Sequence, residues 1–181
     1  MGGFVLEGER LRLRPFEPWD ADQLFNLIND FDIVQNLSAV PWPYERRMAE
    51  QFIRASIDLE TEGRDFRRAI ELRGRAGLVG GLDLRLEDSE RDSFGYWLGK
   101  TYWGMGYMTE ALGLMVDHAF AVLKMEVVTA SALVGNSGSL AVMRKNGFVP
   151  VDQHDFDRPT FGDRVRMQRM RLTRVDWEAP R

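Results

Sequence analysis

The chain has 181 residues, of which 24 are Lys or Arg, 28 are Asp or Glu and none is cysteine, and its net charge is −4. The missing cysteines exclude disulfides, thiolate catalysis and cysteine–metal sites, and two histidines alone argue against a metal centre. The acidic balance argues against a nucleic-acid-binding protein, and the lack of a run of about 18 apolar residues argues against a membrane span.

The length predicts one domain over residues 1–181, with a core over about 9–172 and a loose tail at 173–181. The N-terminal segment 1–14 lacks the apolar centre of a signal peptide, so we expect a cytoplasmic protein.

In the first half of the chain, the predicted elements are a strand at 10–14, helices at 19–30 and 44–60, and strands at 66–72 and 78–86. Arg and Leu alternate through the first strand, which is typical of a half-buried strand, and Pro15 ends it. The turn Pro41-Trp42-Pro43-Tyr44 is stiff and presents two aromatic side chains. The glycine-containing turn at 73–77 has hairpin chemistry.

In the second half, an acidic loop at 87–92 leads into a strand at 93–98, a glycine turn and a long helix. The remaining predicted elements are a strand at 126–134, a helix at 137–146, and strands at 148–153 and 164–172. This order, β-α-α-β-β-β-α-β-α-β-β, predicts an α/β fold in which a mixed sheet carries helices on both faces.

The glycine turn is the first chemical signal. Gly104 and Gly106 stand where the turn feeds the long helix, so a ligand can approach the backbone closely. The N–H groups that begin a helix have no intrahelical partners and lie at the positive end of its dipole. A strand, a glycine turn and a helix start together favour a phosphate site, although a turn that binds nothing has the same pattern.

Two common phosphate motifs do not fit this turn. A P-loop needs Gly-Lys-Ser or Gly-Lys-Thr, whereas Tyr107 and Met108 follow Gly106. A dinucleotide fingerprint needs a third glycine where Thr109 stands, and an acid at the end of the next strand. Glu126 has the required spacing but begins that strand.

A second motif, Asn-x-x-Ser-x-x-Val-Met-x-Lys-x-Gly-Phe, covers Asn136–Phe148. Together with Tyr-Trp at 96–97 and the segment Tyr-Trp-Gly-Met-Gly-Tyr-Met-Thr-Glu-Ala-Leu at 102–112, it resembles the GNAT acetyltransferases over about 9–172. The similarity is greatest to the branch of ribosomal-protein-alanine N-acetyltransferases. The phosphate motif of the family, Arg or Gln-x-x-Gly-x-Gly or Ala, falls on Thr101, Gly104 and Gly106, so its first position departs from the pattern.

The resemblance implies a single-domain GNAT fold with a mostly antiparallel sheet of six to seven strands and a splayed central parallel pair. It implies acetyl-CoA as co-substrate, no metal, and a backbone N–H near Leu98 that polarises the thioester. The implied cofactor contacts are Trp97, Leu98, Trp103, Gly104, Met105, Gly106, Tyr107, Met108, Thr109, Asn136 and Ser139. Asn136 also reads as a helix cap.

Many relatives carry a tyrosine seven residues after this asparagine as the acid that protonates the leaving thiolate, but Met143 stands there. We expect Ser139 to replace it, against the alternative of a helix serine with no chemical role. Asp83 and Asp157 are the candidate general bases, with Asp155 and His154 near the second of them.

Trp42, Tyr44 and Phe156 are the candidate walls of the acceptor pocket, although ordinary packing or a contact between two copies in a homodimer explains them equally well. The expected function is transfer of acetyl from acetyl-CoA to a primary amine, either a protein N-terminus or a small molecule. A non-catalytic acyl-CoA sensor or scaffold is the alternative.

Overall fold

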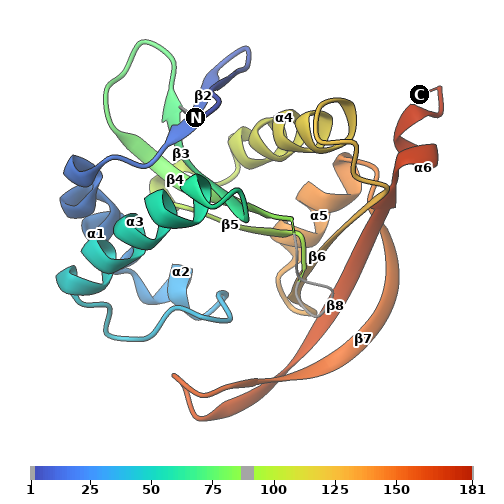
Figure 1. Ribbon diagram of the computed structural model, residues 1–181. Coiled ribbons are helices and arrows are strands. Elements are labelled where there is room, and N and C mark those ends of the chain that lie inside the picture. Colours follow the sequence, from blue (N-terminus) through green and yellow to red (C-terminus); the bar gives the residue numbers. More distant parts are fainter. Residues whose placement is uncertain (1–2, 87–91, 181) are drawn as a thin grey trace.

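A computed structural model describes residues 3–86 and 92–180, which form one sheet of eight strands with helices on both faces (Figure 1). The sheet order is β1-β2-β3-β4-β5-β6-β8-β7. The strands are β1 (Leu6–Glu7), β2 (Leu11–Pro15), β3 (Asp65–Leu72), β4 (Leu78–Arg85), β5 (Phe94–Leu98), β6 (Val127–Leu133), β7 (Val149–Arg158) and β8 (Asp163–Thr173). The helices are α1 (Ala21–Ile28), α2 (Phe31–Val34), α3 (Arg46–Thr61), α4 (Tyr107–Ala121), α5 (Ser137–Lys145) and α6 (Arg174–Glu178).

Two cores cover the two faces of the sheet. Helix α4 packs its buried residues on one face, where they meet inward side chains of β2, β4, β6 and β8 together with α5. Helices α1 and α3 cover the other face over β3 and β4. In β2, Leu11 and Leu13 are buried while Arg12 and Arg14 point away from them, as the alternation predicts. The predicted α/β fold with a mixed sheet is confirmed.

The central strands β5 and β6 are parallel but pair only at Phe94 and Ala130, so their C-terminal halves diverge. On its other edge β5 stays in register with β4 along its whole length, from Phe94 opposite Leu84 to Leu98 opposite Gly80. A Cβ added at Gly80 would lie 2.3 Å from the backbone oxygen of Trp97. The glycine therefore lets β5 lie close to β4. The single pairing of β5 with β6 confirms the predicted splayed pair.

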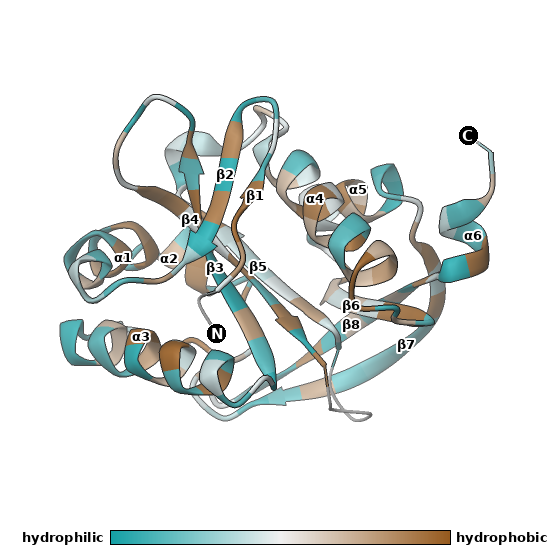
Figure 2. Cartoon of the chain, turned by 45° about the horizontal axis from the view of Figure 1, so that its top comes forward, coloured by the Kyte–Doolittle hydropathy of each residue, from teal (hydrophilic) through white to brown (hydrophobic). Residues whose placement is uncertain are grey.

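The C-terminal part differs from the expectation in two places. Strand β7 runs to Arg158, because its backbone pairing with β8 continues to Arg158 opposite Asp163, beyond the rest of the sheet (Figure 1). Asp155 and Asp157 form ion pairs with Arg166 and Arg164 across this part of the hairpin. Hydrophilic residues colour most of β7 teal in Figure 2, in keeping with its exposed side chains.

The segment 173–181, predicted to be a loose tail, contains helix α6, so that prediction is wrong. The Trp177 ring stacks on Phe120 with centroids 5.4 Å apart, and its indole donates to Asp117. Strand β1, which pairs Leu6 with Leu13, also brings the strand count above the six or seven expected. The acidic loop falls mainly on residues 87–91, which lie outside the described residues. No helix in the described ranges is long and apolar enough to cross a membrane.

Candidate active site

The glycine turn forms an open loop at the start of α4. Gly104 and Gly106 have φ angles of +73° and +78°, which only glycine adopts without strain. Gly106 is the N-cap residue of α4, and no side chain caps the helix start. Residues 103–106 are exposed, and a Cβ at Gly104 would meet nothing within 4 Å. The backbone N–H groups of the first helical turn are therefore accessible to an anion.

The loop is joined to the splayed strand by Trp103. Its indole Nε1 donates to the Leu98 carbonyl over 2.9 Å, at the C-terminal end of β5. The N–H of the next residue, Gly99, donates to Val79 and is not available to a ligand. Met108 is buried in the core, so among the predicted loop contacts it can act only through its backbone.

Ser139 lies in the first turn of α5 beside β5. Its Oγ is 2.7 Å from the Tyr96 hydroxyl, and its N–H donates to Asn136 Oδ1 over 3.0 Å. Asn136 therefore caps α5, as the alternative interpretation of the sequence had it. Burial raises the pKa of Tyr96 to about 12, while the hydrogen bond with Ser139 opposes that rise, so the phenol holds its proton at neutral pH.

On the opposite face of the sheet, four charged side chains of β3 and β4 alternate in sign. The strand register sets Arg67 opposite Asp83 and Asp65 opposite Arg85. Asp83 Oδ2 is 3.2 Å from Arg85 Nη2, and the Arg67 guanidinium lies 4.9 Å from the ring centroid of Phe52 in α3. Burial raises the pKa of Asp83, and the charges of Arg85 and Arg67 only partly oppose the rise.

The other sequence candidates differ in their surroundings. Asp157 is exposed on the β7–β8 hairpin, where a hydrogen bond from Arg164 lowers its pKa, the wrong direction for a general base. Tyr44 is buried in the core under α1 and α3, so it does not line an open pocket as expected. Burial raises the pKa of its phenol to about 12.

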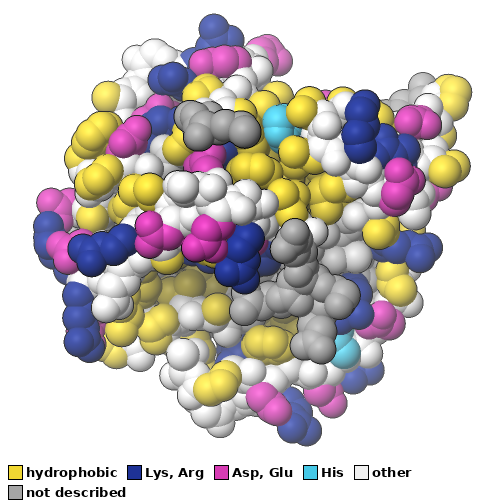
Figure 3. All heavy atoms as spheres, viewed as in Figure 1, with side chains coloured by type: hydrophobic (Ala, Val, Ile, Leu, Met, Phe, Trp, Pro, Cys, Tyr) yellow, Lys and Arg dark blue, Asp and Glu magenta, His cyan; other side chains and the backbone are white. Residues whose placement is uncertain are grey.

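Trp42 and Phe156 are the exposed members of the predicted acceptor wall. The Trp42 ring packs edge-on against Phe31 of α2, with centroids 5.6 Å apart. The ring centroid of Phe31 in turn lies 6.5 Å from that of Phe161, at the tip of the β7–β8 hairpin. On the face shown in Figure 3, hydrophobic side chains line a recess and charges of both signs surround it.

The hairpin tip and α2 are joined. Arg158 Nη1 donates to the Gln35 carbonyl over 2.6 Å, and the same guanidinium is paired with Asp163 and lies over the Phe161 ring. The end of α2 and the hairpin tip are therefore in direct contact. Sequence reasoning missed this bridge, because nothing local relates Arg158 to Gln35.

The family model of the acetyltransferase (GNAT) domain matches residues 10–149. The chain belongs to the GNAT acetyltransferase family. It is 28% identical over 146 residues to the uncharacterized N-acetyltransferase p20 of Bacillus licheniformis, over 80% of this chain and 82% of that protein. It is 32% identical over 152 residues to the putative ribosomal N-acetyltransferase YdaF of Bacillus subtilis (strain 168), over 78% and 79%.

Among solved structures, RimL, described as a ribosomal L7/L12 alpha-N-protein acetyltransferase in complex with coenzyme A, is similar with a TM-score of 0.79. The two chains share 19% identity, over 97% of this chain and 100% of that one, and this likeness supports the GNAT fold. The family assignment identifies this GNAT protein as an acyltransferase that uses acetyl-CoA.

The geometry fits acetyl-CoA. The exposed loop at Gly104 and Gly106 offers backbone N–H groups to a diphosphate, and the divergence of β5 from β6 leaves strand edges free for amide groups. When bound, acetyl-CoA supplies an acetyl thioester that an amine can attack. Within residues 3–86 and 92–180, no three His, Asp or Glu side chains are grouped to hold a metal ion.

Proposed function

We propose that this GNAT protein acetylates an amine presented on a chain end, either the N-terminus of a protein or a small primary amine. The observation that carries the proposal is the contact between the hairpin tip and α2, which packs in the core on the same face of the sheet as Asp83. We infer that this contact narrows the approach to that face, so that an extended peptide end or a small molecule enters more readily than a lysine on a folded protein, which brings its own surface with it. The descriptions of YdaF and RimL favour a protein N-terminus.

We assign the general base to Asp83. Its raised pKa makes the carboxylate a stronger base toward an ammonium group than an ordinary exposed carboxylate. Arg85, on the same strand, is paired with the carboxylate, and Arg67 stands opposite Asp83 on the neighbouring strand β3. Asp157 lacks this environment.

We assign the proton donor to Ser139, backed by Tyr96. Their oxygens are 2.7 Å apart, so a proton lost from the serine can be replaced from the phenol. Asp83 lies opposite Gly95 in the sheet, so its side chain is on the face to which residue 95 belongs. Side chains alternate along a strand, so Tyr96 points to the opposite face. A base on one face and an acid on the other suit direct transfer of the acetyl group from a thioester bound between them to the amine.

Replacing Ser139 with alanine is expected to lower kcat by roughly ten- to a thousand-fold, because the acid is removed. The affinity for CoA should change less than about two-fold, since the backbone of the loop is untouched. Ser137→Ala is the matched control, because Ser137 is exposed at the start of the same helix. Steady-state kinetics would refute the assignment if both variants kept kcat within a factor of two.

The acceptor class is tested by competition. Thiol release is measured with a short peptide beginning with Ala or Ser, with a polyamine, and with a folded protein that has a blocked N-terminus and many lysines. We expect the peptide or the polyamine to react at least about tenfold faster in kcat/KM than the blocked protein, since one tenfold step corresponds to about 1.4 kcal/mol of transition-state binding. Fastest acetylation of the blocked protein would show that the bridge does not restrict the acceptor.

A further inference from the structure

Arg10 connects β2 to the glycine loop and to α4. Its Nη1 donates to the Met105 carbonyl over 2.8 Å, and its Nε donates to Glu110 Oε2 over 2.8 Å. The other carboxylate oxygen of Glu110 accepts from the backbone N–H groups of Arg10 and Leu11, at 2.8 Å and 3.2 Å. Burial raises the pKa of Glu110, but these bonds outweigh that effect and lower it, so the carboxylate remains charged beside the guanidinium.

The free part of the guanidinium faces the loop. Nη2 lies 3.4 Å from the position that a Cβ at Gly106 would occupy. A guanidinium carries five N–H donors, and the two bonds to Met105 and Glu110 leave the Nη2 pair free among the described residues. Arg10, Gly106, Thr109 and Lys145 line one cavity of about 400 Å³, together with Glu9 and Glu110.

The loop itself lacks the cation that the family motif can carry. The first motif position, Arg or Gln in the pattern, is Thr101 here, an exposed residue of the turn Lys100–Tyr102. Guanidinium N–H groups form shorter and stronger bonds to phosphate oxygens than neutral N–H groups do. Arg10 places such donors at the same loop from the turn before β2.

We propose that Arg10, the residue before β2, supplies the guanidinium that the loop sequence lacks, and that it binds the diphosphate of CoA together with the N–H groups of the α4 start. Its bond to Met105 keeps that carbonyl oxygen turned toward the guanidinium, so the loop presents donors to the anion. The proposal rests on the use of CoA by the family and adds a binding residue from outside the motif.

A merely structural role predicts a different outcome. The Arg10 and Glu110 side chains are 45% and 16% exposed, and ion pairs that reach the surface contribute little to stability. If Arg10 only fastened β2 to α4, its loss would shift the melting temperature slightly and would not distinguish ligands with phosphate from ligands without it.

The test is Arg10→Gln, titrated by calorimetry with CoA, 3′-dephospho-CoA and pantetheine. We expect the Kd values for CoA and 3′-dephospho-CoA to rise by the same factor, about 10- to 100-fold, because each ligand loses a charge-assisted bond to its diphosphate. The Kd for pantetheine, which has no phosphate, should stay within about two-fold. Arg10→Lys should give an intermediate loss, since lysine keeps the charge but cannot hold Met105 and a phosphate at once.

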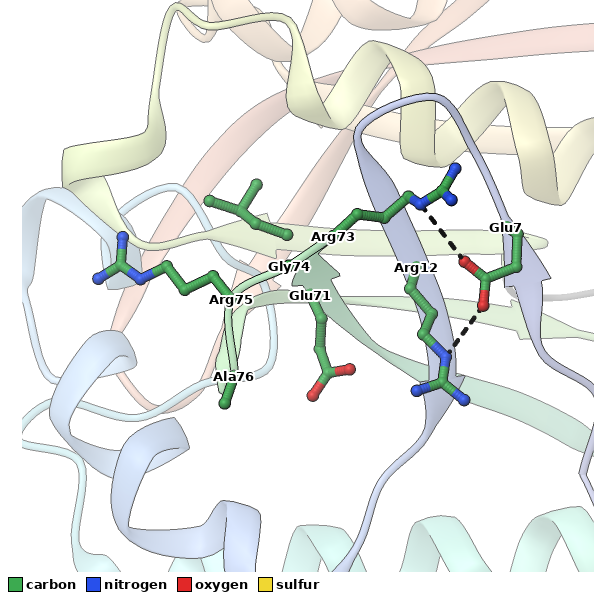
Figure 4. A pocket seen from close by; sticks show the side chains of 8 residues that line it. Glu7, Arg12, Glu71, Arg73, Gly74, Arg75 and Ala76 are labelled. Carbon is green, nitrogen blue, oxygen red and sulfur yellow. Dashed lines mark ion pairs between the residues drawn. The ribbon is translucent and has the colours of Figure 1, made fainter.

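Arg12→Gln is the matched control. Arg12 lies two residues further along the chain, in β2, pairs with Glu7 at 3.2 Å and faces a separate cavity near Arg73 and Glu71 (Figure 4). Equal losses for all three ligands, or no difference from Arg12→Gln, would overturn the proposal. A loss for CoA but not for 3′-dephospho-CoA would place Arg10 at the 3′-phosphate and overturn the diphosphate assignment. Failure of the unaltered protein to bind CoA would instead contradict the cofactor itself.

Discussion

Replacement of Gly106 with valine is expected to remove CoA binding from a protein that still folds. Gly106 caps α4 with a φ of +78°, in an exposed loop where a phosphate must contact the backbone. A branched side chain would occupy that space and strain the turn. Loss of two bonds to a charged group, at about 1.5 kcal/mol each, corresponds to a Kd increase of about 100-fold in a calorimetric titration.

The control for Gly106→Val is Gly63→Val. Gly63 has a φ of +71° in the turn after α3, and a Cβ there would meet nothing within 4 Å. It therefore carries the same backbone cost without a ligand nearby, and its melting temperature calibrates that cost. Unchanged CoA affinity in folded Gly106→Val would show that the phosphates bind elsewhere.

Replacement of Asp83 with asparagine is expected to lower kcat/KM by about 10²- to 10⁴-fold at neutral pH, because the amide cannot accept a proton from the amine. In the unaltered protein kcat/KM should rise with pH through a carboxyl pKa above the ordinary value, since burial raises the pKa of Asp83. This acidic limb should be missing from the residual activity of the variant. The variant Asp157→Asn, on the exposed hairpin, should keep both the kcat/KM of the unaltered protein and the acidic limb of its pH profile.

As pH rises, the stability of the unaltered protein should change in the opposite sense to its activity. A carboxyl whose pKa is higher in the folded chain than in the unfolded chain favours folding below its unfolded pKa, near 3.9, and that contribution is lost as pH rises through the folded pKa. Asparagine cannot ionise, so the variant should lack this pH-dependent loss in denaturant titrations. Equal loss of activity and of folded protein would mean that Asp83 is structural and that the base lies elsewhere.

Local sequence was enough to predict the glycine loop and the order of the main elements. Two glycines close together, Gly104 and Gly106, are typical of a turn, and both have positive φ angles. Asn136 is typical of a helix cap, and it caps α5. The tertiary part of the site was not predictable in the same way. Tyr96 meets Ser139, 43 residues away, only because β5 and α5 pack together.

Long-range contacts also explain the errors. The segment after Gln153 looks like a loop, but it pairs with Asp163–Met167 of β8 and is a strand. The tail is helical because Trp177 stacks on Phe120 and donates a hydrogen bond to Asp117, both on α4. The role of Gly80 depends on how closely β5 approaches it, and no pattern within β4 reveals that distance.

The position of β8 between β6 and β7 affects how the chain folds as it leaves the ribosome. Strands β1 to β5 pair in the order in which they are made, whereas β6 obtains its antiparallel partner only when Asp163–Thr173 has been synthesised. Until then one edge of β6 is open to pairing with another chain. The N-terminal half can therefore form early, while the half that completes the acetyl-CoA site waits for nearly the whole polypeptide. Released chains that end before residue 163 should depend on chaperones more than the full-length chain.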